Sequence, residues 1–284
     1  MQRGAIVGFD GSQPPSFVEE AGALLEEIGF DALWVPEHVL FFPDYDPQYP
    51  YSGDGRLRGN PKGVMDPFAV LTFLAATTSR IRLGTGICIV PQRHPAYLAK
   101  HVADLDRLSG GRFDFGVGVG WQREEYEALG IPFEERGRRM DEALEAMEAL
   151  WTEDVATYRG EFVNLECMWS HPKPVQRPHP PILVGGESPA ALRRVATHGD
   201  GWFGFDLTPE TCARHLETLA TRLDAVGAQL SDRRLIASPG PGAKSTKTVR
   251  GFESIGIEQL VVPIAGRDLE SLRTRALKML DWMG

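Results

Sequence analysis

The sequence has little cysteine, and its three cysteines are too few and too far apart to build a covalent or metal-bound framework. Cys88, Cys167 and Cys212 are an odd number, and none lies near a histidine at metal-ligand spacing. We therefore expect neither a disulfide network nor a metal site, and a reducing cytoplasm is the expected compartment. The chain also lacks a Gly-rich P-loop, a nucleophile elbow and an HExxH pattern, which excludes the function classes that these motifs mark.

Long apolar runs and long basic runs are missing as well. No stretch approaches the roughly 18 apolar residues of a membrane span, and residues 1–10 start like a strand, without the apolar core of a secretory signal. The net charge is −9 at pH 7, and the 30 Lys and Arg residues form no long run, so a nucleic-acid backbone would be repelled. We predict a cytoplasmic protein that binds neither membranes nor nucleic acids.

The chain does show a regular alternation of two apolar periods. Short β-rich runs alternate with longer amphipathic stretches, which is typical of βα units around a parallel sheet. The predicted strands are 5–9, 32–35, 81–90, 112–119, 182–184, 201–205, 235–237 and 259–262. Eight such units in 284 residues favour one (β/α)8 TIM barrel domain over 1–284, with a short insertion at about 152–180 after the fourth unit. A doubly wound open sheet is the alternative.

In such a barrel the functional residues lie at the carboxyl ends of the strands. His38 follows the second predicted strand beside Glu37 and is a candidate proton donor or acceptor, although a hydrogen-bonded structural histidine would look the same. Gly185 and Gly186, with Ser188 before a helix, suit a phosphate at a helix N-terminus, or form a plain strand-to-helix turn. The same strand ends also carry Gly86, Ile87, Gly118, Gly120, Trp121 and Glu187.

A long irregular segment, 39–64, follows the second strand. Loops of this length are usually functional or disordered, and its aromatic side chains would lie over the mouth of the barrel as a substrate wall or lid. A surface loop that orders only in an oligomer is the alternative. The predicted substrate-pocket residues are Phe41, Phe42, Tyr45, Tyr49 and Tyr51.

Seven short motifs are spread along nearly the whole chain. They are LWVPEH at 33–38, IRLGTG at 81–86, RHPAYLAKHVADLDRL at 93–108, SGGRFDFGVGVGW at 109–121, PILVGGESPAALRR at 181–194, GDGW at 199–202 and QLVVPIAGRD at 259–268. No single motif is specific, but in their order and spacing they resemble the bacterial-luciferase-like monooxygenase superfamily. More narrowly, they resemble its branch of coenzyme F420-dependent (8-hydroxy-5-deazaflavin) oxidoreductases.

The resemblance implies a barrel that holds a flavin-like ring on a non-prolyl cis peptide bond, here Gly86 to Ile87. It also implies a phosphate at the turn from Gly185 to Ser188, and His38 in contact with the ring or the substrate, which makes His38 the predicted catalytic residue. The cofactor-binding residues that it implies are Glu37, His38, Gly86, Ile87, Gly118, Gly120, Trp121, Gly185, Gly186, Glu187 and Ser188. Sugar-phosphate dehydrogenases of this branch carry an acidic Glu where Trp121 stands here, which argues against glucose-6-phosphate oxidation.

The sequence thus predicts a flavin- or deazaflavin-dependent oxidoreductase that transfers hydride between coenzyme F420 and a small, largely apolar or aromatic molecule. An FMN-dependent monooxygenase, supplied with reduced flavin by a separate flavin reductase, is the first alternative, because Glu187 and Ser188 fit both cofactors. A non-catalytic F420-binding protein is the second. The resemblance also implies a homodimer.

Overall fold

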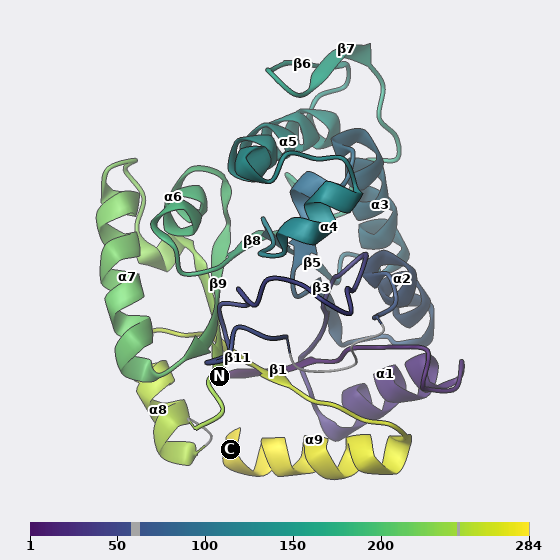
Figure 1. The fold of residues 1–284 in the computed structure, drawn as a ribbon, viewed down its shortest axis with the longest axis vertical. Coiled ribbons are helices and arrows are strands. Elements are labelled where there is room, and N and C mark those ends of the chain that lie inside the picture. Colours follow the sequence, from purple (N-terminus) through teal and green to yellow (C-terminus); the bar gives the residue numbers. More distant parts are fainter. Residues whose placement is uncertain (58–62, 243–244, 284) are drawn as a thin grey trace.

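The computed structural model describes residues 1–57, 63–242 and 245–283, and it shows helices arranged around a closed sheet (Figure 1). The strands are β1 (Gln2–Ile6), β2 (Ala32–Val35), β3 (Arg82–Thr85), β4 (Cys88–Ile89), β5 (Phe113–Gly118), β6 (Ala156–Arg159), β7 (Asn164–Met168), β8 (Ile182–Gly185), β9 (Gly201–Leu207), β10 (Arg234–Pro239) and β11 (Gln259–Pro263). The α-helices are α1 (Phe17–Ile28), α2 (Pro67–Thr77), α3 (Pro95–Leu108), α4 (Arg123–Ala128), α5 (Arg136–Thr152), α6 (Pro189–His198), α7 (Pro209–Asp224), α8 (Thr246–Ser254) and α9 (Leu269–Met283).

Parallel pairing closes the main sheet into a barrel. The strand order is β3, β2, β1, β11, β10, β9, β8, β5 and β4, and β3 also pairs with β5, which closes the ring. β3 and β4 together make one barrel strand that is interrupted at the cis peptide bond between Gly86 and Ile87. The predicted (β/α)8 barrel and the implied cis bond are therefore confirmed, and the open sheet is wrong.

Some predicted boundaries differ from the observed ones. The first strand is expected at 5–9 but spans Gln2–Ile6, because its ladder with β11 runs from Gln2 to Ile6. Phe9 is buried beyond the strand, where its carbonyl accepts a hydrogen bond from the Met65 amide. The strand expected at 81–90 is split in two. Helix α4 is not predicted, because six residues are too few for an apolar stripe to show.

Several helix starts follow from local sequence. A proline stands in the first turn of α2, α3, α6 and α7, where a backbone N–H is not needed. The side chains of Asp66, His94, Ser188 and Thr208 precede these prolines, and each accepts a hydrogen bond from the first turn. Helix α1 ends at Gly29 with φ 97°, a left-handed conformation that suits glycine.

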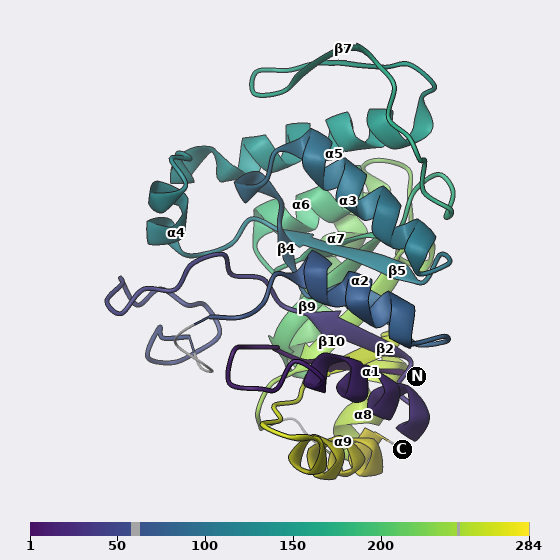
Figure 2. The same cartoon turned by 90° about the vertical axis from the view of Figure 1, so that its right-hand side faces the viewer.

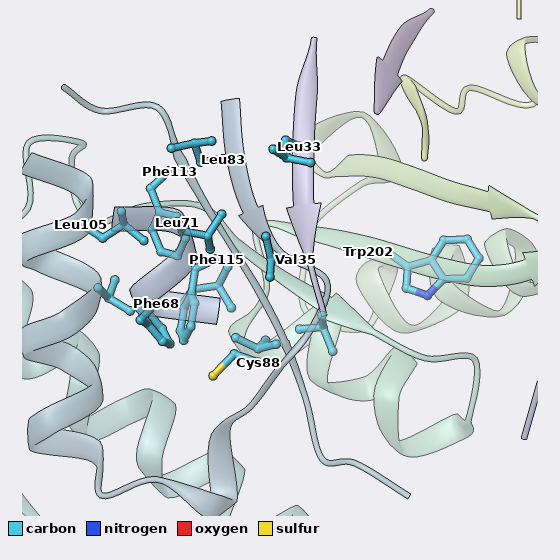
Figure 3. Close-up of a cluster of buried hydrophobic side chains, with 14 of the residues drawn as sticks. Leu33, Val35, Phe68, Leu71, Leu83, Cys88, Leu105, Phe113, Phe115 and Trp202 are labelled. Atoms are coloured by element: carbon cyan, nitrogen blue, oxygen red, sulfur yellow. The ribbon is translucent and has the colours of Figure 1, made fainter. Parts of the chain in front are cut away.

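The main hydrophobic core lies between the barrel and the helices. Figure 3 shows strand side chains gathered against those of α2 and α3. Alternate residues of a strand point to opposite faces, so these outward side chains belong to the helix-facing layer and their neighbours point into the barrel. The labelled members of this layer are Leu33, Val35, Phe68, Leu71, Leu83, Cys88, Leu105, Phe113, Phe115 and Trp202.

The interior of the barrel is filled in layers. Where the strands begin, the fully buried Asp114 accepts hydrogen bonds from Arg82 Nε at 2.9 Å and Arg234 Nη1 at 2.7 Å. Above this ion cluster, the Trp34 ring lies against the backbone of Gly84 and Gly116, where a Cβ atom would collide or crowd. The rest of this layer consists of Ile6, Ala32, Leu183, Phe203, Ile236 and Val261. A ligand is therefore expected at the carboxyl ends of the strands rather than in the centre.

The antiparallel pair β6 and β7 stands away from the barrel beyond α5 (Figure 1). Glu142 of α5 holds its turn, because the Glu142 carboxylate accepts the backbone N–H groups of Glu161 and Phe162 at 2.9 and 2.8 Å. The segment that returns to β8 is tied to α3, where Lys100 Nζ donates to the His171 carbonyl. This excursion lies outside the strand ring and contributes none of its strands.

Glu26 of α1 holds the turn that leads into β3. Its carboxylate accepts the backbone N–H groups of Ser79, Arg80 and Ile81 at 3.0, 2.6 and 2.8 Å. Partial burial opposes ionisation, but these N–H groups outweigh it and lower the pKa of Glu26 to about 2. We expect Glu26→Gln to lower the free energy of unfolding by about 1 kcal/mol at pH 7, as measured by urea denaturation.

The adjacent Glu27 provides the control for this experiment. Glu27 makes an exposed pair with Arg273 at 3.7 Å, so Glu27→Gln should cost less than about 0.5 kcal/mol. Because the folded-state pKa of Glu26 is depressed, its stabilising effect is complete above the ordinary value of 4.5 and is lost as the pH falls towards 2. Equal unfolding free energies for the two variants at pH 7 would contradict this role.

Candidate active site

The mouth of the barrel lies where the strands end. Figure 2 shows the loop after β2 and helix α4 projecting on the same side of the molecule, away from the two termini. β2 leads to His38, β3 to Gly86 and Ile87, β5 to Trp121, and β8 to Glu187. Because parallel strands end on the same side, the structure brings these predicted residues to one rim.

His38 is held by a carboxylate that the sequence did not single out. The His38 Nδ1 atom lies 3.3 Å from Glu125 Oε2, and the N–H groups of Val39 and Leu40 donate to Glu125 Oε1 at 2.6 and 3.0 Å. Glu125 is only 1% exposed and comes from α4. Burial disfavours the charged carboxylate, but hydrogen bonds from His38 and Leu40 outweigh it and lower the pKa of Glu125. An anionic Glu125 therefore orients the His38 ring.

The Glu37 carboxylate binds other groups of the protein itself. Its buried carboxylate accepts the Ile89 amide N–H at 2.5 Å and Arg93 Nε at 2.8 Å. Arg93 in turn binds Asp66, the residue that caps α2. Glu37 thus fixes the backbone just after the cis bond, which makes it a positioning residue here, and its predicted contact with a cofactor stays a prediction.

Ile87 forms an apolar shelf at the rim. A Cβ atom on Gly118 would lie 2.6 Å from Ile87 Cδ1, and one on Gly185 would lie 2.9 Å from Ile87 Cγ2. These two predicted glycines therefore provide room for Ile87 beside β5 and β8. The Ile87 side chain is only half-buried, so it presents an apolar surface to the mouth.

The turn after β8 has the geometry of a helix N-terminal site. Gly186 has φ 106°, and Ser188 Oγ accepts the Ala191 N–H at 3.1 Å at the start of α6. The Glu187 carboxylate accepts the Phe205 N–H at 2.7 Å and the Tyr51 hydroxyl at 2.9 Å. Burial raises the pKa of Glu187 despite these two hydrogen bonds.

The aromatic loop reaches across the mouth. The Tyr51 ring lies 4.9 Å from Phe205 and 5.6 Å from Tyr49, measured between ring centroids. Burial, with the nearby Asp206 charge, raises the pKa of Tyr49 to about 12. The Phe41 ring centroid lies 5.2 Å from that of His38, with the two rings tilted by 58°, while Phe42 is half-buried and makes no ring contact within the described part of the chain. Residues 58–62 of the predicted loop lie outside the described residues.

Trp121 connects the histidine side of the mouth with the loop. Its ring centroid lies 5.9 Å from His38, 5.7 Å from Tyr45 and 5.3 Å from Tyr49. Trp121 Nε1 is a buried donor without a hydrogen-bond partner among residues 1–57, 63–242 and 245–283. An acceptor-rich flat ring such as a flavin or deazaflavin suits this donor. Together with the Ile87 shelf and the α6 N-terminus, the residues present fit such a cofactor.

Sequence reasoning missed several residues of this site. Glu125 and Arg93 were not predicted, because their roles depend on partners far away in the chain. The one available signal was the acidic first turn of α4 shortly after Trp121. Asp206 also escaped; its φ of 56° is rare outside glycine and marks an irregular strand end. No sequence signal would have found Ser238, which lies in β10 and has a buried Oγ.

Two kinds of feature are absent from the described residues. No helix there is long and apolar enough to cross a membrane. No group of three or more His, Cys, Asp or Glu side chains in the same residues is arranged to hold a metal ion.

Comparisons with known sequences show a consistent family likeness. The model of the luciferase-like monooxygenase family matches residues 3–246. An uncharacterized protein of Mycobacterium tuberculosis is 41% identical over 184 residues, which are 64% of this chain and 65%, less than two thirds, of that relative. The FMNH2-dependent dimethylsulfone monooxygenase of Pseudomonas putida is 37% identical over 133 residues, which cover 46% of this chain and 36% of that enzyme.

Solved structures share the fold over nearly the whole chain. A monooxygenase from Streptomyces bottropensis is 26% identical with a TM-score of 0.67, and the match covers 98% of this chain and 83% of that one. An F420-dependent secondary alcohol dehydrogenase in complex with an F420-acetone adduct is 16% identical with a TM-score of 0.78 and full coverage of both chains. The second likeness shows the fold alone. Proteins that use FMN and proteins that use F420 are thus both among the matches.

Proposed function

The chain belongs to the luciferase-like monooxygenase family, and from this premise we propose that it is an oxidoreductase that transfers hydride between coenzyme F420 and a small organic substrate. In this proposal the cofactor lies against Ile87 and Trp121, and its phosphate lies at the turn from Gly185 to Ser188. His38 handles the proton that accompanies hydride transfer. The aromatic loop encloses the substrate.

Glu187 and Ser188 by themselves fit both cofactors, so the observation that carries the choice of cofactor is the second carboxylate, Asp206, beside this turn. Asp206 lies close enough to act electrostatically on Glu187, and no Arg or Lys forms an ion pair with either carboxylate within the described residues. FMN ends in a phosphomonoester, which carries nearly two negative charges at pH 7, whereas the F420 phosphate is a diester with one. Two carboxylates without a cation repel the doubly charged group more strongly, which favours the deazaflavin.

The residues of the mouth have separate tasks in this reaction. When bound, a deazaflavin supplies hydride transfer, much as a nicotinamide does. Glu125 accepts the Nδ1 proton of His38, so His38 Nε2 is left to take a proton from the substrate or to return one. Tyr51 and Trp121 keep the loop over the site, which excludes water from the reacting groups.

A paired titration tests the cofactor assignment. The purified protein is titrated with oxidised F420 and, separately, with FMN, and both dissociation constants are read by calorimetry in the same buffer. We expect micromolar or tighter binding of F420, about −8 kcal/mol, and at least tenfold weaker binding of FMN. Glu187→Gln should reduce the difference between the F420 and FMN dissociation constants, because it removes a negative charge that repels mainly the doubly charged phosphate of FMN. Glu217 is exposed on α7, so Glu217→Gln should leave the ratio of the two dissociation constants unchanged.

Tighter binding of FMN by the unmodified protein would contradict the proposal. It would favour the FMN-dependent monooxygenase, and oxygen uptake with reduced FMN from a flavin reductase would then measure that activity. Binding of neither cofactor would refute both. The resemblance also leads us to propose a homodimer, which analytical ultracentrifugation of the purified chain would test.

A further inference from the structure

Half of the mouth is not used by the proposed cofactor site. Every predicted cofactor residue lies at the carboxyl end of β2, β3, β5 or β8 or follows it, whereas the ends of β9, β10, β11 and β1 form the opposite side of the ring. The inward side chains on that side are mostly apolar, and Ile6, Phe203 and Ile236 form one cluster against which Phe205 packs. This second half is where a substrate beside the cofactor would lie.

Ser238 points into this half of the barrel. Along β10, Arg234 binds the interior Asp114 and Ile236 belongs to the interior cluster, whereas Leu235 and Ala237 belong to the outer core. Because strand side chains alternate, Ser238 lies on the same face as Ile236, one step closer to the mouth.

An irregularity next to Ser238 does not disturb this alternation. Ala237 pairs with Gly204 and Pro239 pairs with Leu207, so β9 contains one residue more than β10 between these pairs. The extra residue belongs to β9, where Asp206 adopts its left-handed conformation. β10 keeps its period of two, and Asp206 lies exposed at the rim of the mouth.

The Ser238 hydroxyl is buried and has no hydrogen-bond partner among the described residues. The residue is 1% exposed, and Ser238 Oγ makes no hydrogen bond to any residue that the structure describes. A buried hydroxyl without a partner is costly, and Ile236, the preceding residue on the same face of β10, belongs to the apolar interior cluster. A ligand that forms a hydrogen bond with Ser238 Oγ would remove this energetic cost.

The charges around this half restrict the ligand further. Glu187 and Asp206 are carboxylates on its β8 and β9 side, and neither is paired with an Arg or Lys in the described chain. An anionic ligand would meet repulsion there that no ion-paired Arg or Lys of the described residues offsets. The unpaired hydroxyl can both donate and accept a hydrogen bond.

We propose that Ser238 is the specificity-determining residue of the substrate half of the mouth, where its Oγ binds a single uncharged hydroxyl or carbonyl group of a small, otherwise apolar molecule, while Asp206 and Glu187 exclude anions. This inference rests on the proposed function only in placing the cofactor on the β2 to β8 side. It names the substrate class as neutral alcohols and carbonyl compounds, and it excludes carboxylates and phosphates.

Three ring compounds of similar size test the inference by calorimetry on the full chain. Benzyl alcohol carries the neutral group, toluene lacks it, and benzoate carries a charge. We expect benzyl alcohol to bind about five- to tenfold more tightly than toluene, the effect of one buried neutral hydrogen bond, and more tightly than benzoate. Ser238→Ala should reduce the affinity for benzyl alcohol to that for toluene, while Ser238→Thr should keep the preference. Asp206→Asn should strengthen benzoate binding.

Two controls separate this role from a structural one. Ser254→Ala removes an exposed hydroxyl on α8 that donates to the Gly251 carbonyl, and it should leave all three affinities unchanged. Because Ser238 Oγ has no hydrogen-bond partner among the described residues, Ser238→Ala should keep or raise the thermal midpoint of unfolding, and a clear loss would assign the hydroxyl a structural role instead.

The remaining outcomes overturn the inference in distinct ways. An unchanged ratio of benzyl alcohol to toluene affinity in Ser238→Ala would show that Ser238 does not recognise the ligand. Tightest binding of benzoate, or no binding of any ring compound, would refute the substrate class. Binding of F420 without binding of the rings would overturn this inference alone, and binding of the rings without F420 would overturn the proposed function alone.

Discussion

The His38→Asn variant is expected to lose about 10²- to 10⁴-fold in kcat, the usual effect of removing a positioned acid or base. The cofactor dissociation constant should change little, because Ile87, Trp121 and the turn at Glu187 remain. Asn fits the site but cannot exchange a proton near neutral pH. The measurement is turnover of the bound cofactor, followed by its visible absorbance with a neutral alcohol or carbonyl substrate.

A histidine on the barrel flank provides the control. His101 of α3 contacts Phe68 at 5.7 Å between ring centroids and lies outside the mouth, so His101→Asn should keep kcat within about twofold. A protein that binds F420 without any turnover, and whose affinity is unaffected by His38→Asn, would instead be the non-catalytic binding protein. An unchanged kcat in His38→Asn would mean that a group other than His38 transfers the proton that accompanies hydride transfer.

The Glu125→Ala variant should lose both stability and activity. It leaves the buried N–H groups of Val39 and Leu40 without an acceptor and releases the His38 ring. Unmaking hydrogen bonds to a buried charged group costs about 3 kcal/mol, and a catalytic group displaced by about 1 Å can cost about 10²-fold in kcat. Urea denaturation measures the first effect, and turnover under conditions where the variant is folded measures the second.

Glu125→Gln separates positioning from folding. The amide keeps one oxygen for the loop N–H groups but carries no charge, so stability should recover in part while the pH profile of kcat changes. Because the pKa of Glu125 is depressed in the folded protein, its stabilising effect is complete above its ordinary value of 4.5 and is lost as the pH falls through the folded value.

The exposed Glu127 on the same helix supplies the matched control. Glu127→Ala should change stability by no more than about 0.5 kcal/mol and should leave the pH profile of kcat unchanged. A pH profile in Glu125→Gln identical to that of the unmodified protein would mean that Glu125 only supports the loop and has no influence on His38.

Much of the barrel was predictable because its signals are local. The apolar periods located the strand Ala32–Val35, and a proline in the sequence stands at the observed start of the helices that begin at Pro67, Pro95 and Pro189. Each of these depends on burial of one face or on a capping side chain a few residues away. The strand ends then followed from the barrel geometry, which places His38, Trp121 and Glu187 on one rim. The boundary of β1 was not predictable, because the pairing with β11 ends the strand, whereas burial continues to Phe9.

The sequence by itself determined the order of the βα units, the barrel and the residue types at its mouth, because short-range periodicity encodes which face of each element is buried. Only the tertiary structure decided which groups meet there. Glu125 lies 87 residues from His38, and Glu187 lies 136 residues from Tyr51. Such contacts depend on how α4 and the loop dock on the finished barrel, and no local period records that docking. For the same reason the sequence could not show that the Ser238 hydroxyl is buried without a hydrogen-bond partner among the described residues, because this depends on how the surrounding strands pack.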